Sequence, residues 1–273
     1  MLLTNNQSCT SVKTNALKAS IVENSPTLVL LPKLELLVNN NEPTLEDILK
    51  ICSHDEELLS KLTRRSGFEG SSEDFAKEIL FKKGLGFLKS LAIRTMNQEI
   101  FSLPLGLDNM STALIKRRSV ILARFLKHFT SDLDREADDL YLIGLLYNFH
   151  YVCFEHLVKM GELTTDDFDD VRSECLTLSC ELFNNIGFDP YVIGVLEESE
   201  KQIFETKNPF EQALLKIANC TLEQAEQTGG LLGRKVRMNR ELLDATGYSE
   251  RELLTLLKDL SKNYKCTSVP WRR

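Results

Sequence analysis

Signals that begin and end helices recur along this chain, whereas signals for strands are nearly absent. Thr44 followed by Glu46 and Asp47 is typical of a helix N-terminus, because hydroxyl and carboxylate groups satisfy the free backbone N–H groups there. Ser249 and Glu252 have the spacing of a capping box. No Asn-Gly or Asp-Gly turn joins alternating apolar runs, as a hairpin would require. The sequence therefore predicts an all-α protein, a bundle of many helices.

Further helix boundaries follow from the same chemistry. Asp189-Pro190 and Asn208-Pro209 each predict an N-terminus, since proline suits the first helical position. Gly187 is predicted just after a helix end, where glycine accepts a left-handed backbone. Residues 137–160 are apolar around most of a helical circumference and are predicted to form one central buried helix. Other starts are expected at Ser71-Ser72 and Ser111, and a further helix around Leu58, Leu59 and Leu62.

Three motifs that could suggest ligand sites have structural interpretations that fit better. The Gly-Leu-Gly at 84–86 follows no predicted strand, so a helix break or close helix packing is favoured over a phosphate cradle. The TGGLLG at 228–233 is predicted to be a helix end and turn. The acidic residues of 166–170 follow Thr164-Thr165, so they are predicted to stabilise the first turn of a helix and not to bind magnesium.

The length of 273 residues allows one large core or two modest ones. Leu103-Pro104-Leu105-Gly106 is typical of a loop and predicts a boundary near residue 105. We therefore expect a mobile polar leader at 1–25, an N-terminal helical subdomain at 26–105, a larger helical subdomain at 106–233 and a C-terminal helical extension at 234–273.

Charge and cysteine content exclude several partners. The net charge of −7 would repel a nucleic-acid backbone, and the ten Lys/Arg of 234–273 are better explained as solvated helix faces. The seven cysteines are an odd number without a C-x-x-C pair, which predicts reduced core residues in a cytoplasmic protein. No apolar run reaches the roughly 18 residues of a membrane span. We expect neither nucleic acid nor a membrane as a partner.

The residues by themselves predict no catalytic, metal or cofactor site. The histidines at 54, 128, 150 and 156 form neither an H-x-x-x-H pair nor an adjacent His-Asp. A lone imidazole cannot hold a metal, so His150 is predicted to be an interhelical polar residue. Ser179 lies mid-helix without a nearby histidine or a G-x-S-x-G elbow, which excludes the usual serine nucleophile.

The order of several segments nevertheless forms a familiar pattern: LPKLELLVNN, PTLEDILKIC, EILFKKGLGFLKSLAI, IKRRSVILARFL, YLIGLLYNFH, FNNIGFDPYVIGVLEE and LLKIANC. Over about residues 27–260 this pattern resembles the HDOD family, a bacterial signalling domain related to the metal-dependent phosphohydrolases of the HD superfamily. The resemblance implies an HDOD/HD-like helical bundle in two subdomains.

The resemblance also implies that the metal site of the catalytic relatives is degenerate here. Tyr147-Asn148 stands where those relatives have His-Asp, Arg118 where they have a first histidine ligand, and Asn219 where the family has an aspartate. Cys175 and Ser199-Glu200 align with further histidines. A cationic Arg118 would repel a divalent ion, and Tyr and Asn cannot replace an imidazole and a carboxylate. Metal-dependent hydrolysis at these positions is therefore not expected.

The resemblance implies a non-catalytic regulatory protein that acts in signal transduction by binding a protein partner. It is also compatible with a homodimer. The former metal pocket either binds an anionic small ligand through arginine or forms a buried hydrogen-bonded cluster that locks the bundle, and the second interpretation is favoured. The residues expected at this pocket are Arg118, Tyr147, Asn148, Cys175 and Asn219.

Two alternatives remain open. The first is a metal-dependent phosphohydrolase with a relocated site, built from His150 with Glu197, Glu198 or Glu200. The second, less favoured, is nucleic-acid binding through the Lys-Arg-Arg at 116–118 and the basic tail.

Overall fold

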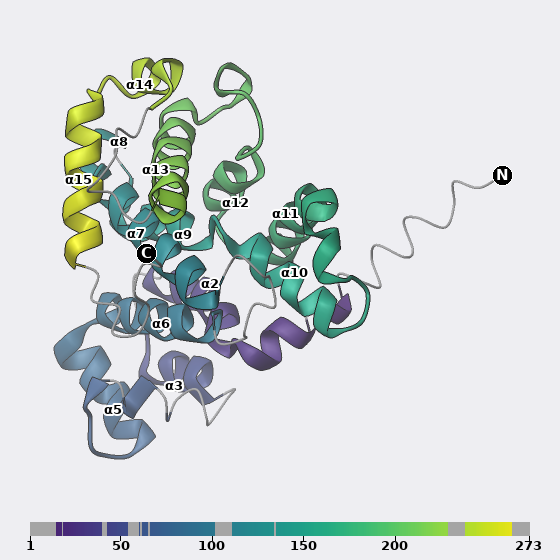
Figure 1. The fold of residues 1–273 in the computed structure, drawn as a ribbon. Coiled ribbons are helices and arrows are strands. Elements are labelled where there is room, and N and C mark those ends of the chain that lie inside the picture. Colours follow the sequence, from purple (N-terminus) through teal and green to yellow (C-terminus); the bar gives the residue numbers. More distant parts are fainter. Residues whose placement is uncertain are drawn as a thin grey trace. The chain divides into compact units, whose positions relative to one another are not determined.

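All regular elements that the structure describes are helices, which confirms the all-α prediction (Figure 1). This computed structural model describes residues 15–17, 19–39, 43–53, 60, 62–64, 66–101, 111–133, 135–228 and 238–263, and no strand occurs within them. In the same ranges, no helix has the length and apolar character needed to cross a bilayer. The predicted boundary near residue 105, the turn at 228–233, Leu58, Leu59 and His54 lie outside the described residues.

The chain forms two compact units, and each unit is assembled from separate stretches of sequence. Unit 1 comprises Met1–Leu103, His156–Glu162 and Glu181–Asp189. Unit 2 comprises Pro104–Glu155, Leu163–Cys180 and Pro190–Arg273. The helices α10 (Phe149–Lys159) and α11 (Phe168–Ile186) therefore contribute residues to both units.

Unit 1 is built around two apolar helices. Helix α2 (Pro26–Val38) packs along α6 (Leu85–Glu99), and the carboxylate of Glu99 accepts a hydrogen bond of 3.1 Å from the backbone N–H of Thr27. Leucine is the commonest of the side chains that the two helices bury, as expected for a helix–helix core. The remaining elements are α3 (Leu45–Ser53), α5 (Ser72–Glu78) and the π-helix η1 (Ile79–Lys83).

The expected mobile leader is wrong for the part of it that the structure describes. Residues 15–17 and 19–24 are helical, and Leu17 and Ile21 are fully buried. The hydroxyl of Ser20 lies 2.8 Å from Nδ1 of the buried His156, which also belongs to unit 1. The i,i+4 spacing of Leu17 and Ile21 gives this polar stretch one apolar face, and that face packs into the core.

Most of the predicted helix boundaries that fall within the described residues are confirmed. Helices α12 (Pro190–Glu197) and α13 (Pro209–Thr228) begin at the two predicted prolines. Gly84, at φ +80°, ends η1 as a helix break, and Gly187, at φ +95°, follows α11 with the N–H of Phe188 donating to Phe183 O. Reciprocal capping occurs at Thr44 with Asp47, Ser71 with Asp74, Thr164 with Asp167, and Ser249 with Glu252.

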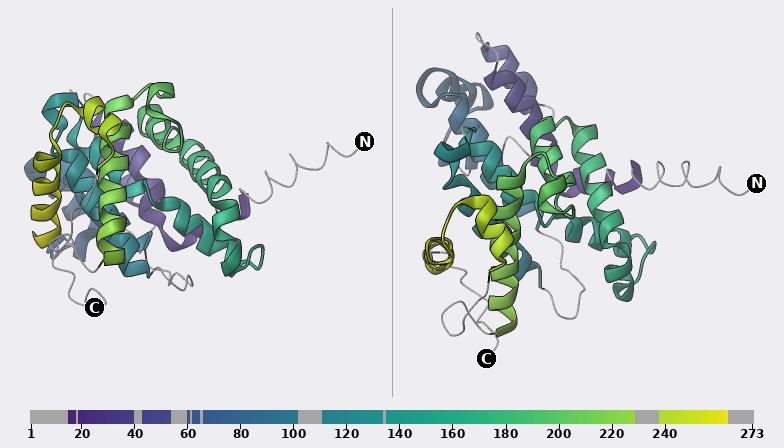
Figure 2. Two further views of the ribbon diagram at one scale, coloured as in Figure 1. Left: turned by 45° about the horizontal axis from the view of Figure 1, so that its top comes forward. Right: turned by 90° about the horizontal axis from the view of Figure 1, so that it is seen from above.

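Unit 2 has α7 (Thr112–Lys127) at its centre. This helix packs against α9 (Ala137–Leu146), α13 and α15 (Glu250–Asn263), and α14 (Arg240–Thr246) packs on α13 (Figures 1 and 2). Short elements complete the unit: α8 (Thr130–Leu133) and the 3-10 turns η2 (Thr165–Asp167) and η3 (Ile203–Glu205).

The single helix predicted over residues 137–160 is wrong, because the chain turns at Tyr147-Asn148 and forms α9 and α10. Asn148 is buried and its amide donates a hydrogen bond of 3.3 Å to the hydroxyl of Ser119 on α7. The N–H of Tyr151 bonds to Asn148 O, which tightens the turn. Asparagine is a poor helix former, and the side chain of Asn148 contacts another helix at the point where the chain leaves α9.

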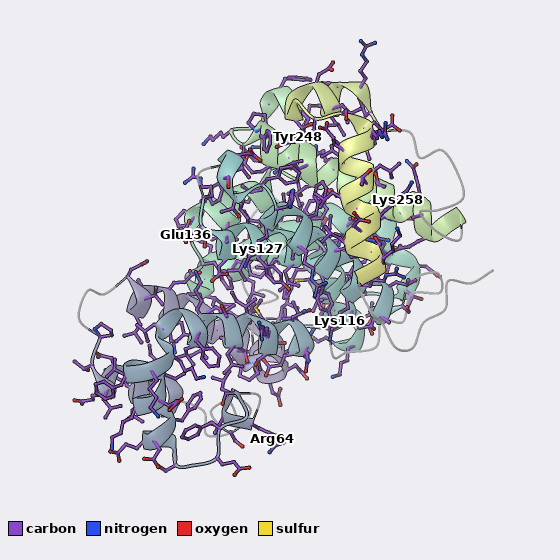
Figure 3. The ribbon with its side chains drawn as sticks, turned by 90° about the vertical axis from the view of Figure 1, so that its left-hand side faces the viewer. Arg64, Lys116, Lys127, Glu136, Tyr248 and Lys258 are labelled. Carbon is purple, nitrogen blue, oxygen red and sulfur yellow. The ribbon has the colours of Figure 1, made fainter. Side chains whose placement is uncertain are left out.

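An aromatic cluster attaches the C-terminal helices to the rest of unit 2. Tyr248 connects α14 to α15 (Figure 3). Its ring packs edge-on against Phe129, with 5.2 Å between the ring centroids. Its hydroxyl donates a hydrogen bond of 2.9 Å to Asp132. Phe210 at the start of α13 joins the same cluster. The described part of the extension is therefore packed into unit 2.

Candidate functional site

Arg118 lies on α7 with only 3% of its side chain exposed, and it is engaged by two carboxylates of α13. Its Nη1 donates to Glu223 Oε1 at 2.8 Å, and its Nη2 donates to Glu226 Oε2. Burial alone would lower the pKa of Arg118, but the two carboxylates outweigh it and raise the pKa above its ordinary value. Arg118 is thus a cation held between two anions inside the helical core.

Asn219 joins this cluster through a shared acceptor. Its Nδ2 donates to Glu223 Oε1 at 3.0 Å, the same oxygen that accepts from Arg118. Asn219, Glu223 and Glu226 are spaced i, i+4 and i+7, so they share one face of α13. Burial raises the pKa of Glu226 above its ordinary value even though Arg118 opposes that change. The cluster therefore carries one positive and two carboxylate groups.

The other three predicted pocket residues come from other segments of unit 2, and Tyr147 is close enough to the cluster for Glu223, after burial, to contribute to its raised pKa. Asn148 contacts Ser119, as described above. Cys175 is buried, and burial raises the pKa of its thiol to about 12, so the thiol is protonated and unreactive. Its carbonyl accepts from Ser179, whose hydroxyl lies 3.1 Å from Cys153 Sγ. Tyr147 lines a pocket.

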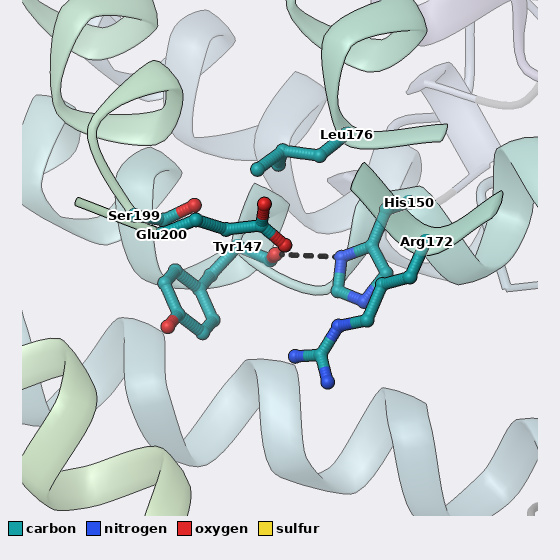
Figure 4. Close-up of a pocket in the computed structure, with 6 residues that line it drawn as sticks. All are labelled: Tyr147, His150, Arg172, Leu176, Ser199 and Glu200. Carbon is teal, nitrogen blue, oxygen red and sulfur yellow. Dashed lines mark hydrogen bonds between the residues drawn. The ribbon is translucent and has the colours of Figure 1, made fainter. Parts of the chain in front are cut away.

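That pocket has a volume of about 40 Å³ and lies entirely within unit 2. Three segments form it: the turn between α9 and α10, successive turns of α11, and the residues that follow α12 (Figure 4). Burial raises the pKa of Tyr147 above its ordinary range, so its hydroxyl stays neutral. The lining residues are Tyr147, His150, Arg172, Leu176, Ser199 and Glu200.

His150 has an unusual hydrogen-bonding state in this pocket. Its Nδ1 lies 3.3 Å from the carbonyl oxygen of Tyr147, and since a carbonyl only accepts, Nδ1 must carry the proton. Burial, aided by the positive charge of Arg172, lowers the pKa of His150 to about 3, so the ring is neutral at physiological pH. Its Nε2 is therefore a bare lone pair, buried and without a hydrogen-bond partner among the described residues.

Opposite charges flank this imidazole. Arg172 is an exposed residue of α11 that lines the pocket. Glu200 is also exposed, and its Oε2 accepts a hydrogen bond of 2.6 Å from Ser173, one residue along from Arg172. The pocket thus offers donors at Arg172 and acceptors at Glu200 and His150.

The residues proposed for a relocated metal site are only partly brought together. His150 and Glu200 line the same pocket. Glu198 is buried elsewhere and accepts from the backbone of Lys207 and the amide of Asn208, and Glu197 is exposed outside the pocket. In the part of the chain that is described, no group of three or more His, Cys, Asp or Glu side chains is placed to hold a metal ion.

Sequence reasoning missed the carboxylates that pair with Arg118 and the arginine of the pocket. The spacing of Asn219, Glu223 and Glu226 was a usable signal, because a cation in an apolar helix requires anions on a neighbouring face. Arg172 and Leu176 also share a helix face at i,i+4. No local sequence pattern predicts that the helix face of Arg172 and Leu176 lines a pocket together with Glu200.

Comparison of the chain with protein-family models, with curated proteins and with solved structures finds no match.

Proposed function

We propose that this chain is a non-catalytic regulatory protein of the HDOD type, which acts in the bacterial cytoplasm by binding a protein partner in signal transduction. The observation that carries the proposal is the pairing of Arg118 with Glu223 and Glu226. The position where catalytic relatives of that family place a metal ligand holds a buried ion cluster that joins α7 to α13. Such a cluster specifies packing, and the positive charge of Arg118 opposes the approach of a cation.

Exposed aromatic side chains give the proposal a testable surface. Phe81 in unit 1 is 75% exposed and Phe204 in unit 2 is 76% exposed. Aromatic residues are enriched among the anchors of protein interfaces, because they bury a large area at a low cost in side-chain entropy. We propose that at least one of them contacts the partner.

The test is chemical crosslinking and affinity capture from bacterial cells, followed by reconstitution with the purified partner. We expect Phe81→Ser or Phe204→Ser to weaken the reconstituted complex about tenfold or more, which is the usual effect of losing an interface anchor. Glu205→Ser, an exposed neighbour of Phe204, is the matched control and should leave affinity unchanged. A complex that is equally tight with both phenylalanine variants would contradict this placement of the contact.

Metal analysis separates the regulatory proposal from the phosphohydrolase alternative. We expect purified protein to hold no stoichiometric transition metal and to hydrolyse no phosphodiester after addition of Mn²⁺. Metal retained by the wild type and lost in His150→Ala and Glu200→Ala would instead support a relocated catalytic site. Sedimentation equilibrium, run in parallel, decides whether the partner includes a second copy of this chain.

A further inference from the structure

Phe81 protrudes from a well-packed element of unit 1. It lies in η1 with 75% of its side chain exposed, whereas Phe75 and Ile79 on the preceding turns are buried. The N–H of Gly84 donates to Ile79 O at 2.7 Å, which is the i→i+5 pattern of a π-helix. Such turns are rare and occur frequently at functional sites. Single exposed apolar side chains are common, so the surroundings of Phe81 decide whether it belongs to a binding surface.

The surroundings of Phe81 are basic. Residues 79–98, which form η1 and most of α6, contain four basic residues and no acidic one, although the whole chain has a net charge of −7. Two of the four, Lys82 and Lys83, follow Phe81 directly and are exposed. An exposed aromatic ring is therefore accompanied by two exposed cations in an otherwise acidic chain.

Contacts within unit 1 leave both ammonium groups accessible. Lys82 pairs with Glu78 at 2.9 Å, but its side chain is 72% exposed, and ion pairs of that kind contribute little. The ammonium of Lys83 lies 5.7 Å from the centroid of the Phe87 ring in the first turn of α6. Lysines at a helix C-terminus also stabilise the helix dipole, and that role leaves their donors open to a carboxylate from outside.

The charge of the rest of the chain favours a short acidic partner segment over an extended polyanion. Outside residues 79–98 the chain carries −11, which an anionic bilayer or a nucleic acid would meet over a wide area. A short acidic segment touches only the positive surface, and exposed charges more than about 8 Å away are largely screened. An apolar side chain in the same segment can cover the Phe81 ring and remove it from water.

Phe204 in unit 2 is equally exposed, but its surroundings have the opposite charge. Residues 197–207 contain four acidic residues and two lysines. An acidic segment would be repelled there and attracted at Phe81. The sign of the charge therefore distinguishes the two exposed phenylalanines as anchors.

We propose that Phe81, Lys82, Lys83 and Phe87 form a docking surface for an acidic segment of a partner protein. An apolar side chain of that segment packs on Phe81, and its carboxylates pair with Lys82 and Lys83. This inference rests on the proposed function, because it specifies the chemistry of the partner and the side chain that anchors it.

The test is a selection of random peptides displayed on phage against the immobilised full chain. We expect the enriched sequences to combine Asp or Glu with Leu, Phe or Trp. Synthetic copies of these peptides should bind about tenfold or more weakly to Phe81→Ser and about threefold or more weakly to Lys82→Gln/Lys83→Gln. Fluorescence anisotropy measures the affinities, which should also fall as the salt concentration is raised.

Matched variants in unit 2 are the controls. Phe204→Ser and Lys201→Gln/Lys207→Gln make the same chemical changes at exposed positions of another surface, and they should leave peptide affinity unchanged. All of these side chains are exposed, so every variant should keep the unfolding midpoint of the wild type.

The proposal is overturned if no peptide is enriched, if the enriched peptides lack acidic residues, or if they bind Phe81→Ser as tightly as the wild type. Vesicles of phosphatidylglycerol are a second probe, and binding that Phe81→Ser abolishes would indicate a membrane surface in place of a protein partner. A reconstituted cellular partner that depends on Phe204 and not on Phe81 would refute this docking surface and leave the proposed function standing.

Discussion

At the scale of single residues, Gly144 determines how closely α7 and α9 approach. A Cβ at this position would lie 2.5 Å from the backbone of Ala123 and of Leu122, a separation that folded proteins do not tolerate. Backbone atoms cannot rotate away as a side chain can, so an added methyl group must push the helices apart. The close packing of α7 against α9 thus depends on the absence of a side chain at Gly144.

Substitution of Gly144 tests this close approach. We expect Gly144→Ala to lower the free energy of unfolding by about 1–3 kcal/mol, the usual cost of overpacking a core. Gly194→Ala in α12 is the control, because no atom lies within 4 Å of its added Cβ. That variant should be stabilised by roughly 0.5–1 kcal/mol through helix propensity. Urea unfolding measures both, and equal effects would refute the argument.

The Arg118 cluster leads to a second prediction at this scale. Arg118→Met should cost about 3–5 kcal/mol, because it removes the cation that bonds to both Glu223 and Glu226. The double variant Arg118→Met/Glu226→Gln should recover part of that loss. Unfolding in urea at pH 7 measures both variants. Destabilisation that persists unchanged in the double variant would show that lost packing, not uncompensated charge, is the cause.

Sequence reasoning reached only part of this site. It favoured a buried hydrogen-bonded cluster of Arg118, Tyr147, Asn148 and Asn219. Of these, Arg118 and Asn219 bond to one carboxylate oxygen, whereas Asn148 bonds to Ser119. It did not find Arg172, because the pocket that Arg172 shares with Glu200 joins segments that are 28 residues apart in sequence. Pairs of this kind are created by tertiary packing, and no local spacing encodes them.

At the scale of helices, the ends are determined by local chemistry. The capping boxes at Ser71 and Ser249 were predictable, since each needs only a hydroxyl and an acid three residues apart. The break at Tyr147-Asn148 was not, because the side chain of Asn148 bonds to Ser119, which lies 29 residues away in sequence. Helix ends were therefore predictable where the residues that determine them lie close together in the sequence.

The cap of α15 can be tested directly. We expect Ser249→Ala to lower the free energy of unfolding by about 1 kcal/mol, because the backbone N–H of Glu252 loses its acceptor. Thr255→Ala is the control in the middle of the same helix, where an exposed hydroxyl bonds only to the carbonyl of Arg251. It should be neutral or slightly stabilising. Thermal unfolding followed by circular dichroism measures both changes.

Buried histidines make the stability of the helices depend on pH. Burial lowers the pKa of His156 to about 4 and that of His150 to about 3. The unfolded chain takes up protons below about pH 6.5, whereas the folded chain does so only near these lower values. The contribution of these histidines to stability is therefore fully present above about pH 6.5, and it is lost as the pH falls to about 4 for His156 and to about 3 for His150. At pH 5 each histidine accounts for a loss of about 2 kcal/mol.

The measurement is urea unfolding at pH 7 and pH 5. His156→Asn keeps a polar group near Ser20 and removes one titrating ring, so the difference between the two pH values should shrink by about 2 kcal/mol. The exposed His128→Asn is the matched control and should behave like the wild type. A variant at position 156 with the full wild-type difference would contradict the assignment.

At the scale of the whole molecule, the units are interleaved in sequence. Unit 1 needs His156–Glu162 and Glu181–Asp189 in addition to its first 103 residues. The added segments bring buried side chains, among them Leu157, Leu182 and Phe183. Short-range patterns predicted helices but not this arrangement, because they do not specify which distant helix covers an apolar face.

A truncation tests the interleaving. We expect a fragment of residues 1–103 to unfold without a cooperative transition, because it lacks the apolar side chains of the two later segments. The control is the full chain, which should show cooperative unfolding under the same conditions. Circular dichroism and hydrogen exchange measure the difference. Native-like protection in the isolated fragment would contradict this account.

The interleaving also constrains how the protein is made. A ribosome releases the chain from its N-terminus, yet Phe183 and Phe188, which pack against each other in unit 1, emerge after most of α7 to α11. Unit 2 cannot close before α15, which packs on α7. The core of unit 1 therefore stays incomplete until residue 189 has emerged, and that of unit 2 until the last part of the chain has been made. Until residue 189 emerges, apolar side chains of α2 are open to chaperones.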